Sequence, residues 1–394
     1  MTSIYYVEDI DSLRFALSIV DEYNVSRFQP HFPGYPVFCF VAYIFYSISQ
    51  SLAFSFSLIG GVSTFFIIYF SLNIMKFKIN SKNGLLCILI IFLNPMIWNL
   101  SNRYMADLMG LSIAIASIYY IVYSKKTYEN YIGFFLAGLL LGVRLSYFPL
   151  VLVPILIFLM KKEKIIRSLS YLVLGISIWL IPFIVSQGFQ NLVFVGSKHS
   201  IGHFTDYGGT IITEQNLLER LIFLVHTIWS DGLGAYWIGR AEVTLVIGII
   251  ILIITVKSIV HSTFKIDSKL EVLILCSIVY LIWIFFFQNL IYKSRHVLPI
   301  VYVMLLFISL SLKYEKFFYS YYTLIISLII LNYHLIVGHK NGTAIYHLSN
   351  DLKIKKTDFI ISNPLINYYL KSNGIKSNYI DIENFNIELF KENF

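Results

Sequence analysis

The chain has 394 residues, of which 57% are hydrophobic, 17% aromatic and only 13% charged. Soluble domains are about 45–50% apolar and about 25% charged, so this composition excludes an ordinary soluble protein. The formal net charge is +8. Because the basic residues are spread over short segments between apolar blocks, and do not form one basic face, we expect no nucleic-acid partner.

Long apolar blocks divide the chain, and several approach the roughly 20 residues that cross about 30 Å of hydrocarbon as a helix. We therefore predict an all-α, multi-pass membrane protein in a lipid bilayer. Five short segments between the blocks are rich in lysine, which is typical of cytoplasmic loops. Placing these segments in the cytoplasm predicts spans near residues 54–75, 84–101, 104–124, 167–186, 243–260, 270–288, 296–312 and 317–338.

Residues 1–53 are expected on the outer side as a loop followed by a juxtamembrane helix. Residues 35–52 are apolar enough to span, so two interpretations stay open: a crossing segment, or a helix lying at the outer interface. Asp9 and Asp11 precede a stiff Pro/Gly-rich turn that begins at His31. Such carboxylates could accept a proton from a hydroxyl, and with His31 they could hold a divalent metal. The alternative is a solvated acidic segment with a helix cap at Asp11 or at the serine after it.

Ionisable residues at membrane depth are costly and tend to line functional sites. Asp107 opens the predicted span 104–124, shortly after Arg103, and either caps that helix or belongs to a site. Arg144 divides residues 131–160 into a predicted hairpin of two short halves. Its guanidinium either binds a phosphate or snorkels to the interface.

Residues 187–242 are predicted to be a large outer loop. His199 and His203 have the i, i+4 spacing of a helical metal pair, but Gly202 between them argues against one. We predict that His203 belongs to a loop that moves over an acceptor site, and a merely solvated loop is the alternative.

Gln288, Lys293, Arg295 and His296 surround the outer end of a later span. The positive-inside rule does not account for cations on this side of the membrane. An anionic ligand explains them better than topology does, and a structural pairing with a carboxylate from another loop is the alternative.

Residues 339–394 are rich in lysine, asparagine, aspartate and serine, unlike residues 1–338. We predict that they form a small soluble appendage with a strand at 358–362, a helix at 364–371 and a second strand at 378–382.

Three motifs together resemble those of the GT-C superfamily of integral-membrane glycosyltransferases. They are acidic residues before His31-Phe-Pro-Gly-Tyr-Pro36, an Asp107 that follows an Asn-Pro…Trp loop, and Arg295-His-Val-Leu-Pro299. The likeness is to the group of dolichyl-phosphate-mannose-protein mannosyltransferases and lipid A aminoarabinose transferases, and it covers about residues 8–299. The resemblance implies a GT-C-like helical bundle with juxtamembrane helices on the outer face.

The resemblance also implies an activity, the inverting transfer of a sugar from a polyprenyl-phosphate-linked donor on the outer or lumenal face. The acceptor would be a hydroxyl of an unidentified glycan, lipid or protein. Asp11 or Asp9 would be the catalytic base, Asp107 the second acidic position, and Arg295 the residue that binds the donor phosphate. Because phosphate leaves as a good anion, cationic stabilisation is needed rather than a general acid. The expected substrate-binding residues are His31, Arg103, Arg144, His203, Gln288, Arg295 and His296.

We expect no cofactor beyond a possible divalent metal, and a bacterial or archaeal cell membrane rather than the endoplasmic reticulum. A transporter or flippase of lipid-linked saccharide is the main alternative. It predicts broken helices at corresponding positions of two halves, and the sequence has no such internal symmetry. A non-catalytic assembly subunit would leave the acidic N-terminal cluster unexplained.

Overall fold

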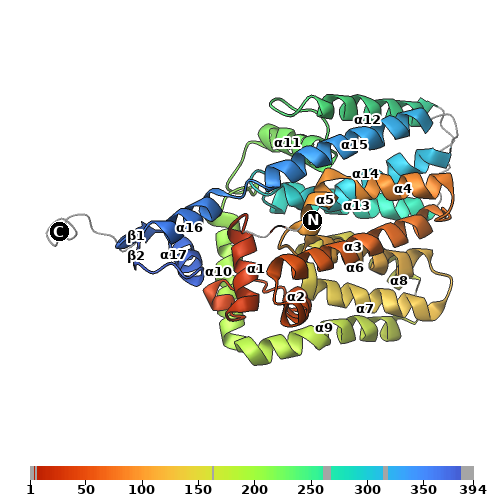
Figure 1. Cartoon of the computed structure of the whole chain (residues 1–394). Coiled ribbons are helices and arrows are strands. Elements are labelled where there is room, and N and C mark those ends of the chain that lie inside the picture. The colour runs from red at the N-terminus through yellow and green to blue at the C-terminus, as the bar shows by residue number, and fades with distance from the viewer. Residues whose placement is uncertain (1–3, 5–6, 162–163, 261–267, 314–317, 383–394) are drawn as a thin grey trace.

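The computed structural model describes residues 4, 7–161, 164–260, 268–313 and 318–382. Within these residues nearly every regular element is a helix, and the one sheet has two short strands. Most of the helices lie side by side in a bundle, and the strands lie outside it at the left (Figure 1).

Five helical stretches of the described chain are long and apolar enough to cross a membrane, and one bent helix pair could make a sixth. This confirms the prediction of an all-α protein with the character of a multi-pass membrane protein. The long stretches contain α3 (Leu52–Met75), α7 (Thr127–Arg144) with α8 (Phe148–Met160), α9 (Ile165–Gln187), α13 (Ser268–Phe287), and α15 (Phe318–His339) with α16 (Ala344–Ile354).

Three predicted spans correspond to shorter apolar helices. They are α6 (Asp107–Ile118), which continues as the π-helical turn η2 (Tyr119–Tyr123), α12 (Val243–Val260) and α14 (Leu298–Leu310). Large apolar side chains are exposed on the bundle, among them Ile166 and Val185 of α9. Exposed apolar surface of this kind is expected where lipid covers the protein.

The predicted span 84–101 is a bent pair, α4 (Lys82–Phe92) and α5 (Pro95–Asn102), whose axes differ by 60°. Pro95 has no N–H with which to continue the first helix. The Asn94 side chain accepts a hydrogen bond from the Ile97 N–H and so begins a new one. The sequence predicted a single span here, and the structure interrupts it for these two reasons.

Residues 131–160 form the predicted hairpin. Arg144 leaves helical geometry at φ −152° and ψ 85°, and the chain turns back through the short 3₁₀ helix η3 (Leu145–Tyr147). The rings of Phe134 and Phe158 lie 5.2 Å apart, centroid to centroid, which shows that α7 and α8 run back along one another. The first arm, α7, has 18 residues and is longer than the short half that the sequence suggested.

The lysine-rich segments lie at one end of the bundle. The Lys82 ammonium lies 3.4 Å from the centre of the Phe318 ring, and Lys269 Nζ donates to the Tyr123 carbonyl. The Arg167 guanidinium lies over the Tyr131 ring. In Figure 1 this end is on the right, and α1 (Ile10–Val20) and α10 (Phe189–Thr205) lie at the left. The described lysine-rich segments, from which the topology was predicted, therefore lie together at one end of the fold.

The N-terminal segment consists of α1, the short 3₁₀ helix η1 (Val25–Arg27) and α2 (Pro36–Ser49). With 14 residues, α2 is about 21 Å long and belongs with α6, α12 and α14 among the shorter apolar helices. This length suits an interfacial helix, and both interpretations of residues 35–52 stay predictions.

Residues 187–242, predicted to be a large outer connection between two spans, are largely helical. They contain α10, α11 (Leu217–His226) and the π-helical turn η4 (Thr227–Gly232). Gly202 lies inside α10. The Tyr207 ring packs directly against it, in the space that a larger side chain would need, because a Cβ added at Gly202 would stand only 2.7 Å from that ring.

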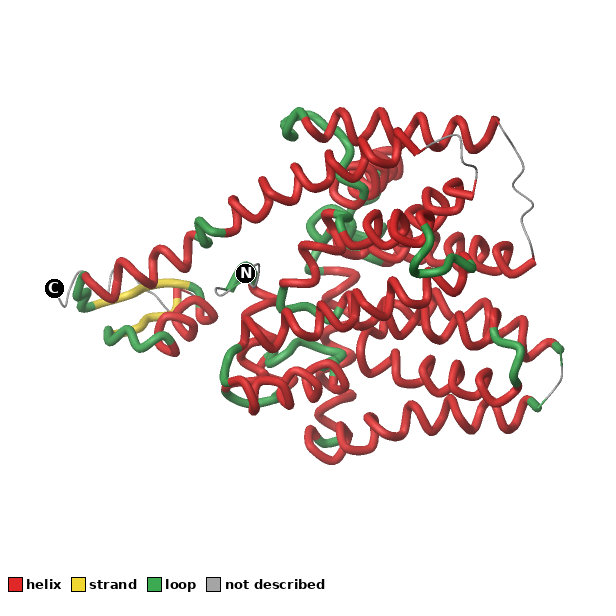
Figure 2. Tube along the Cα trace, turned by 45° about the vertical axis from the view of Figure 1, so that its right-hand side comes forward, coloured by secondary structure: helices red, strands yellow, loops and turns green. Residues whose placement is uncertain are grey.

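The C-terminal residues form the predicted strand, helix and strand: β1 (Phe359–Ser362), α17 (Pro364–Ser372) and β2 (Asn378–Asp381). The two strands are parallel, with Phe359 opposite Asn378 and Ser362 opposite Asp381. Figure 2 shows this unit joined to the bundle through the long α15–α16 stretch. Leu370 of α17 packs into one apolar cluster with Leu13 and Leu17 of α1, so the unit supports the helix that carries Asp11.

Candidate functional site

Asp9 begins α1 as its N-cap. One carboxylate oxygen accepts a hydrogen bond from the Ser12 N–H at 2.8 Å, and the other accepts from Arg103 at 2.9 Å. Arg103 also donates to Glu8 at 2.6 Å. The cap is therefore Asp9, not Asp11 or Ser12, and the Arg103 guanidinium clamps the start of α1 onto the end of α5.

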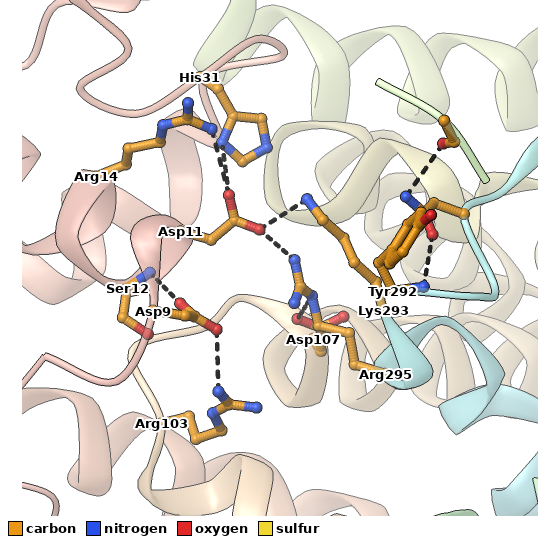
Figure 3. A network of polar contacts seen from close by, with 12 residues as sticks. Asp9, Asp11, Ser12, Arg14, His31, Arg103, Asp107, Tyr292, Lys293 and Arg295 are labelled. Carbon is orange, nitrogen blue, oxygen red and sulfur yellow. Dashed lines mark hydrogen bonds and ion pairs between the residues drawn. The ribbon is translucent and has the colours of Figure 1, made fainter. Parts of the chain in front are cut away.

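Asp11 lies two residues further on, in the first turn of α1, and is 2% exposed. Its Oδ2 accepts from Lys293 Nζ at 2.9 Å and from the Arg295 guanidinium at 2.5 Å (Figure 3). Its Oδ1 faces Arg14 NH1 at 3.4 Å and His31 Nδ1 at 3.8 Å. Burial alone would raise the pKa of Asp11, but the cations Lys293 and Arg295 hold it well below its usual range.

The two cations reach Asp11 from the connection between α13 and α14. Arg295 belongs to the short 3₁₀ helix η5 (Ser294–Val297). The Asn289 side chain accepts from the Tyr292 N–H at 2.9 Å and donates to the Gly208 carbonyl at 3.2 Å. These bonds tie the connection that carries the cations to the loop after α10.

Arg220 of α11 secures the same region and is 1% exposed. Its guanidinium donates to the backbone carbonyls of Gly209, Phe285 and Gln288. It thereby ties the loop after α10 to the end of α13. Sequence patterns do not indicate this role, because Arg220 stands in an amphipathic run, residues 217–229, where a charged side chain is expected on the solvated face.

Asp107 and Arg144 form a second, deeper ion pair, with 2.9 Å between their charged atoms. The Tyr147 hydroxyl donates to Asp107 at 3.3 Å, and Arg144 donates to the Tyr35 hydroxyl at 3.1 Å. Asp107 makes no side-chain cap for α6, and the Arg144 guanidinium does not snorkel to the interface. The two side chains pair with each other, so the helix cap proposed for Asp107 and the snorkelling proposed for Arg144 do not form.

Tyr35 connects this deeper pair to Asp11. Its hydroxyl lies 3.1 Å from His31 Nε2, on the far side of the ring from the nitrogen that faces Asp11. Tyr35 has a left-handed backbone, φ 47°, directly after Gly34 at φ 83°, so the Pro-Gly-Tyr-Pro turn points its side chain at Arg144. Burial lowers the pKa of His31 well below 6.5 against the opposing effect of Asp11, and the imidazole is neutral.

The contacts form a closed ring. It runs from Asp11 through His31, Tyr35, Arg144 and Asp107 to Arg295, whose Nε lies 3.8 Å from the Asp107 carboxylate, and back to Asp11. Segments from α1, the turn before α2, α6, α7 and η5 thus meet at one place. The structure brings together six of the residues that the sequence analysis named, which are Asp11, His31, Asp107, Arg144, Lys293 and Arg295, and adds Tyr35 and Arg14.

Other predicted residues lie around this ring rather than in it. His203 Nε2 lies 2.7 Å from the Phe287 carbonyl. Gln288 is buried, and its carbonyl accepts from Arg220. His296 is buried, and its carbonyl accepts from the Tyr280 hydroxyl at 3.0 Å. These three residues support the connection to α14 by the contacts they make.

His199 is a neighbour of the site that the sequence set aside. Its ring stacks on that of His31 with 5.6 Å between centroids. Burial, with the nearby His203 and Lys293, lowers the pKa of His199 to about 4.

The predicted metal set of Asp9, Asp11 and His31 does not assemble. In the described part of the chain no three histidine, cysteine, aspartate or glutamate side chains are placed to hold a metal ion. Asp9 is bound to Arg103, and a divalent cation at Asp11 would stand directly beside Lys293 and Arg295. These residues therefore do not fit a divalent metal.

Compared with known proteins, the chain matches no protein-family model, no curated protein sequence and no solved structure. What the fold and the site define is a class: an α-helical protein of multi-pass membrane character with an ionic ring at the end of the bundle opposite the lysine-rich segments.

Proposed function

We propose that the protein is a glycosyltransferase of GT-C type. It would transfer a sugar from a polyprenyl-phosphate-linked donor to an acceptor hydroxyl, with inversion, at the membrane face that carries α1. The observation that carries this proposal is the ion pair between Asp11 and Arg295, two residues 284 positions apart in the chain. They come from separate motifs of the resemblance, one expected to supply the base and the other the phosphate ligand.

The chemistry needs two opposite charges close together. A phosphate that departs from a sugar develops negative charge, which fixed cations stabilise in a site shielded from water. Arg295 presents a planar fork of donors, and Lys293 adds a compact charge whose side chain is 36% exposed. Both cations lie within hydrogen-bonding distance of the carboxylate proposed as base, so one bound sugar phosphate could contact all three groups.

Each member of the ring has a distinct part in this proposal. Asp11 accepts the proton of the acceptor hydroxyl as that oxygen attacks the anomeric carbon, and Arg295 and Lys293 bind the phosphate. Asp107 is 0% exposed and paired with Arg144, which favours a role in positioning Arg295 over contact with the sugar. Asp9 is occupied as cap and clamp, which favours Asp11 over Asp9 as the base.

The test is transfer of labelled sugar from a polyprenyl phosphate in membranes that contain the protein, with the product sugar detected on the acceptor. Loss of a positioned base reduces the rate by about 10²–10⁴. We expect Asp11→Asn to show this loss. The matched control is Glu22→Gln, which alters an exposed ion pair with Arg27 and should leave transfer unchanged. Movement of the lipid-linked sugar across the membrane without any product would identify a flippase instead.

A further inference from the structure

Lys293 and Arg295 share a single acceptor atom. Both donate to Oδ2 of Asp11, at 2.9 Å and 2.5 Å. Arg14 lies 3.4 Å from the other oxygen of the same carboxylate. One negative charge therefore faces three cations, and positive charge is left in excess at this place.

The neighbouring carboxylates are occupied elsewhere. Asp9 pairs with Arg103, and Asp107 lies 2.9 Å from Arg144 but 3.8 Å from Arg295. Arg295 Nε is buried and faces the Asp107 carboxylate at this distance without a hydrogen bond. The cluster therefore has excess positive charge for a further anion.

We propose that Asp11 and the donor phosphate compete for Lys293 and Arg295: the phosphate binds by replacing the Asp11 carboxylate as partner of these two cations, and the carboxylate is thereby released. This inference rests on the proposed function and adds a mechanism that couples donor binding to the availability of the base. A phosphate suits both partners, because its oxygens accept from the arginine fork and from the lysine ammonium together.

The exchange changes Asp11 as a base. While both cations face its carboxylate, its pKa lies well below the usual range, and such a carboxylate accepts a proton poorly. Once the phosphate has drawn Lys293 and Arg295 away, less positive charge faces Asp11 and its basicity rises. The acceptor hydroxyl is then activated only after the donor has bound, which fixes the order of binding.

If Asp11 simply contacted the substrate, its removal would weaken phosphate binding. The competition predicts the opposite. Asp11→Asn removes the competing charge, so the variant should bind a phosphate more tightly although it has lost the base. Close charge pairs couple by about 1.5 kcal/mol or more, which corresponds to a gain in affinity of about tenfold or more. Glu22→Gln is the control and should bind as the wild type does.

Binding is measured by calorimetry on the full chain in detergent, with citronellyl phosphate, with inorganic phosphate, and with citronellol as the uncharged control. A gain for Asp11→Asn with either phosphate supports the competition, and the phosphate that shows it tells whether the prenyl chain is required. Equal or weaker binding of both phosphates by a folded Asp11→Asn overturns it.

A double-mutant cycle tests the shared partner directly. In the wild type, Lys293 leaves Asp11 in order to bind phosphate, whereas in Asp11→Asn it has no such bond to lose. Lys293→Gln should therefore reduce phosphate affinity more in the Asp11→Asn background than in the wild type. Equal reductions in the two backgrounds contradict the proposal.

A measurement on the wild type keeps the test valid if Asp11→Asn does not fold. Infrared difference spectra of protein with ¹³C-labelled aspartate should show a shift of a carboxylate band when citronellyl phosphate is added, and none with citronellol. No shift at saturating phosphate overturns the proposal. The transfer assay is separate: phosphate competition without sugar transfer would refute the glycosyltransferase and leave the competition standing.

Discussion

The guanidinium of Arg144 lies 2.9 Å from the carboxylate of Asp107, and the two side chains are only 5% and 0% exposed. Removing one partner of a buried ion pair leaves an uncompensated charge, which is far more damaging than removing both. Arg144 also donates to Tyr35, and Asp107 faces Arg295, so this pair supports both halves of the ring.

We expect Arg144→Gln to lower the free energy of unfolding by about 3–5 kcal/mol, because Asp107 would be left charged and buried. Asp107→Asn should have a comparable effect. The double variant should lose clearly less than the sum of the two, as denaturation in detergent would measure. Additive losses would show that the two residues do not act as a pair.

Acid should destabilise the protein through His199. Its folded-state pKa, about 4, lies below the ordinary 6.5, so protonation favours the unfolded chain. Its contribution to stability is complete above about pH 6.5 and decreases as the pH falls toward 4. Asp11 adds to this decrease only near and below its ordinary pKa of 3.8, where the unfolded chain takes up a proton and the folded chain, with its lowered pKa, does not.

His199→Phe should therefore reduce the fall of the unfolding temperature between pH 6.5 and pH 4, and the remaining fall includes the contribution of buried His31. His334→Phe is the matched control, because His334 is exposed and distant from the site in sequence. The same pH dependence in His199→Phe as in the wild type would contradict the assignment.

Arg220→Met should disturb the site from a distance. The substitution leaves the carbonyls of Gly209, Phe285 and Gln288 without their donor, and each bond to a charged group contributes about 1.5–3 kcal/mol. We expect a loss of at least about 3 kcal/mol in stability and a lower transfer rate, since the Lys293 connection depends on this region. Arg240→Met, in an exposed pair with Asp231, should change stability by no more than about 1 kcal/mol. Equal effects of the two substitutions would refute the role of Arg220.

Leu370→Ala tests whether the C-terminal unit supports α1. Leu370 is 0% exposed in the cluster that contains Leu13 and Leu17. Truncation of a buried leucine removes about 2–5 kcal/mol of stability, and we expect a parallel decrease in transfer. Ile354→Ala, at a side chain 83% exposed, is the control and should have little effect. Unchanged transfer in a destabilised Leu370→Ala would limit the unit to a structural role.

The helices were predictable because long apolar blocks and local signals determine them. Pro95 and Asn94 lie side by side in the sequence, and together they account for the bend between α4 and α5. The helix α10 was missed because Gly202 argues against a helix locally. The Tyr207 ring, five residues further along the chain, packs against Gly202 in the space that a larger side chain would need.

The site was predictable in its members but not in its pairings. Asp11, Asp107, Arg144 and Arg295 were identified because each is a charge near an apolar span. Which charges pair depends on how α1, α6, α7 and η5 pack, and short-range patterns carry no such information. Tyr35 was quoted only as part of its motif, since nothing in Pro-Gly-Tyr-Pro shows that its hydroxyl joins His31 to Arg144.

The two ends of the described chain meet at α1. Thr343 donates to the Val7 carbonyl at 3.1 Å, and Leu370 covers Leu13 and Leu17. The helix α1 is therefore made long before the residues that cover it, since Thr343 and Val7 are 336 positions apart. A nascent chain that stops before α17 leaves Leu13 and Leu17 uncovered on the back of the helix that carries Asp11, so this part of the site acquires its support only after Leu370 has been made.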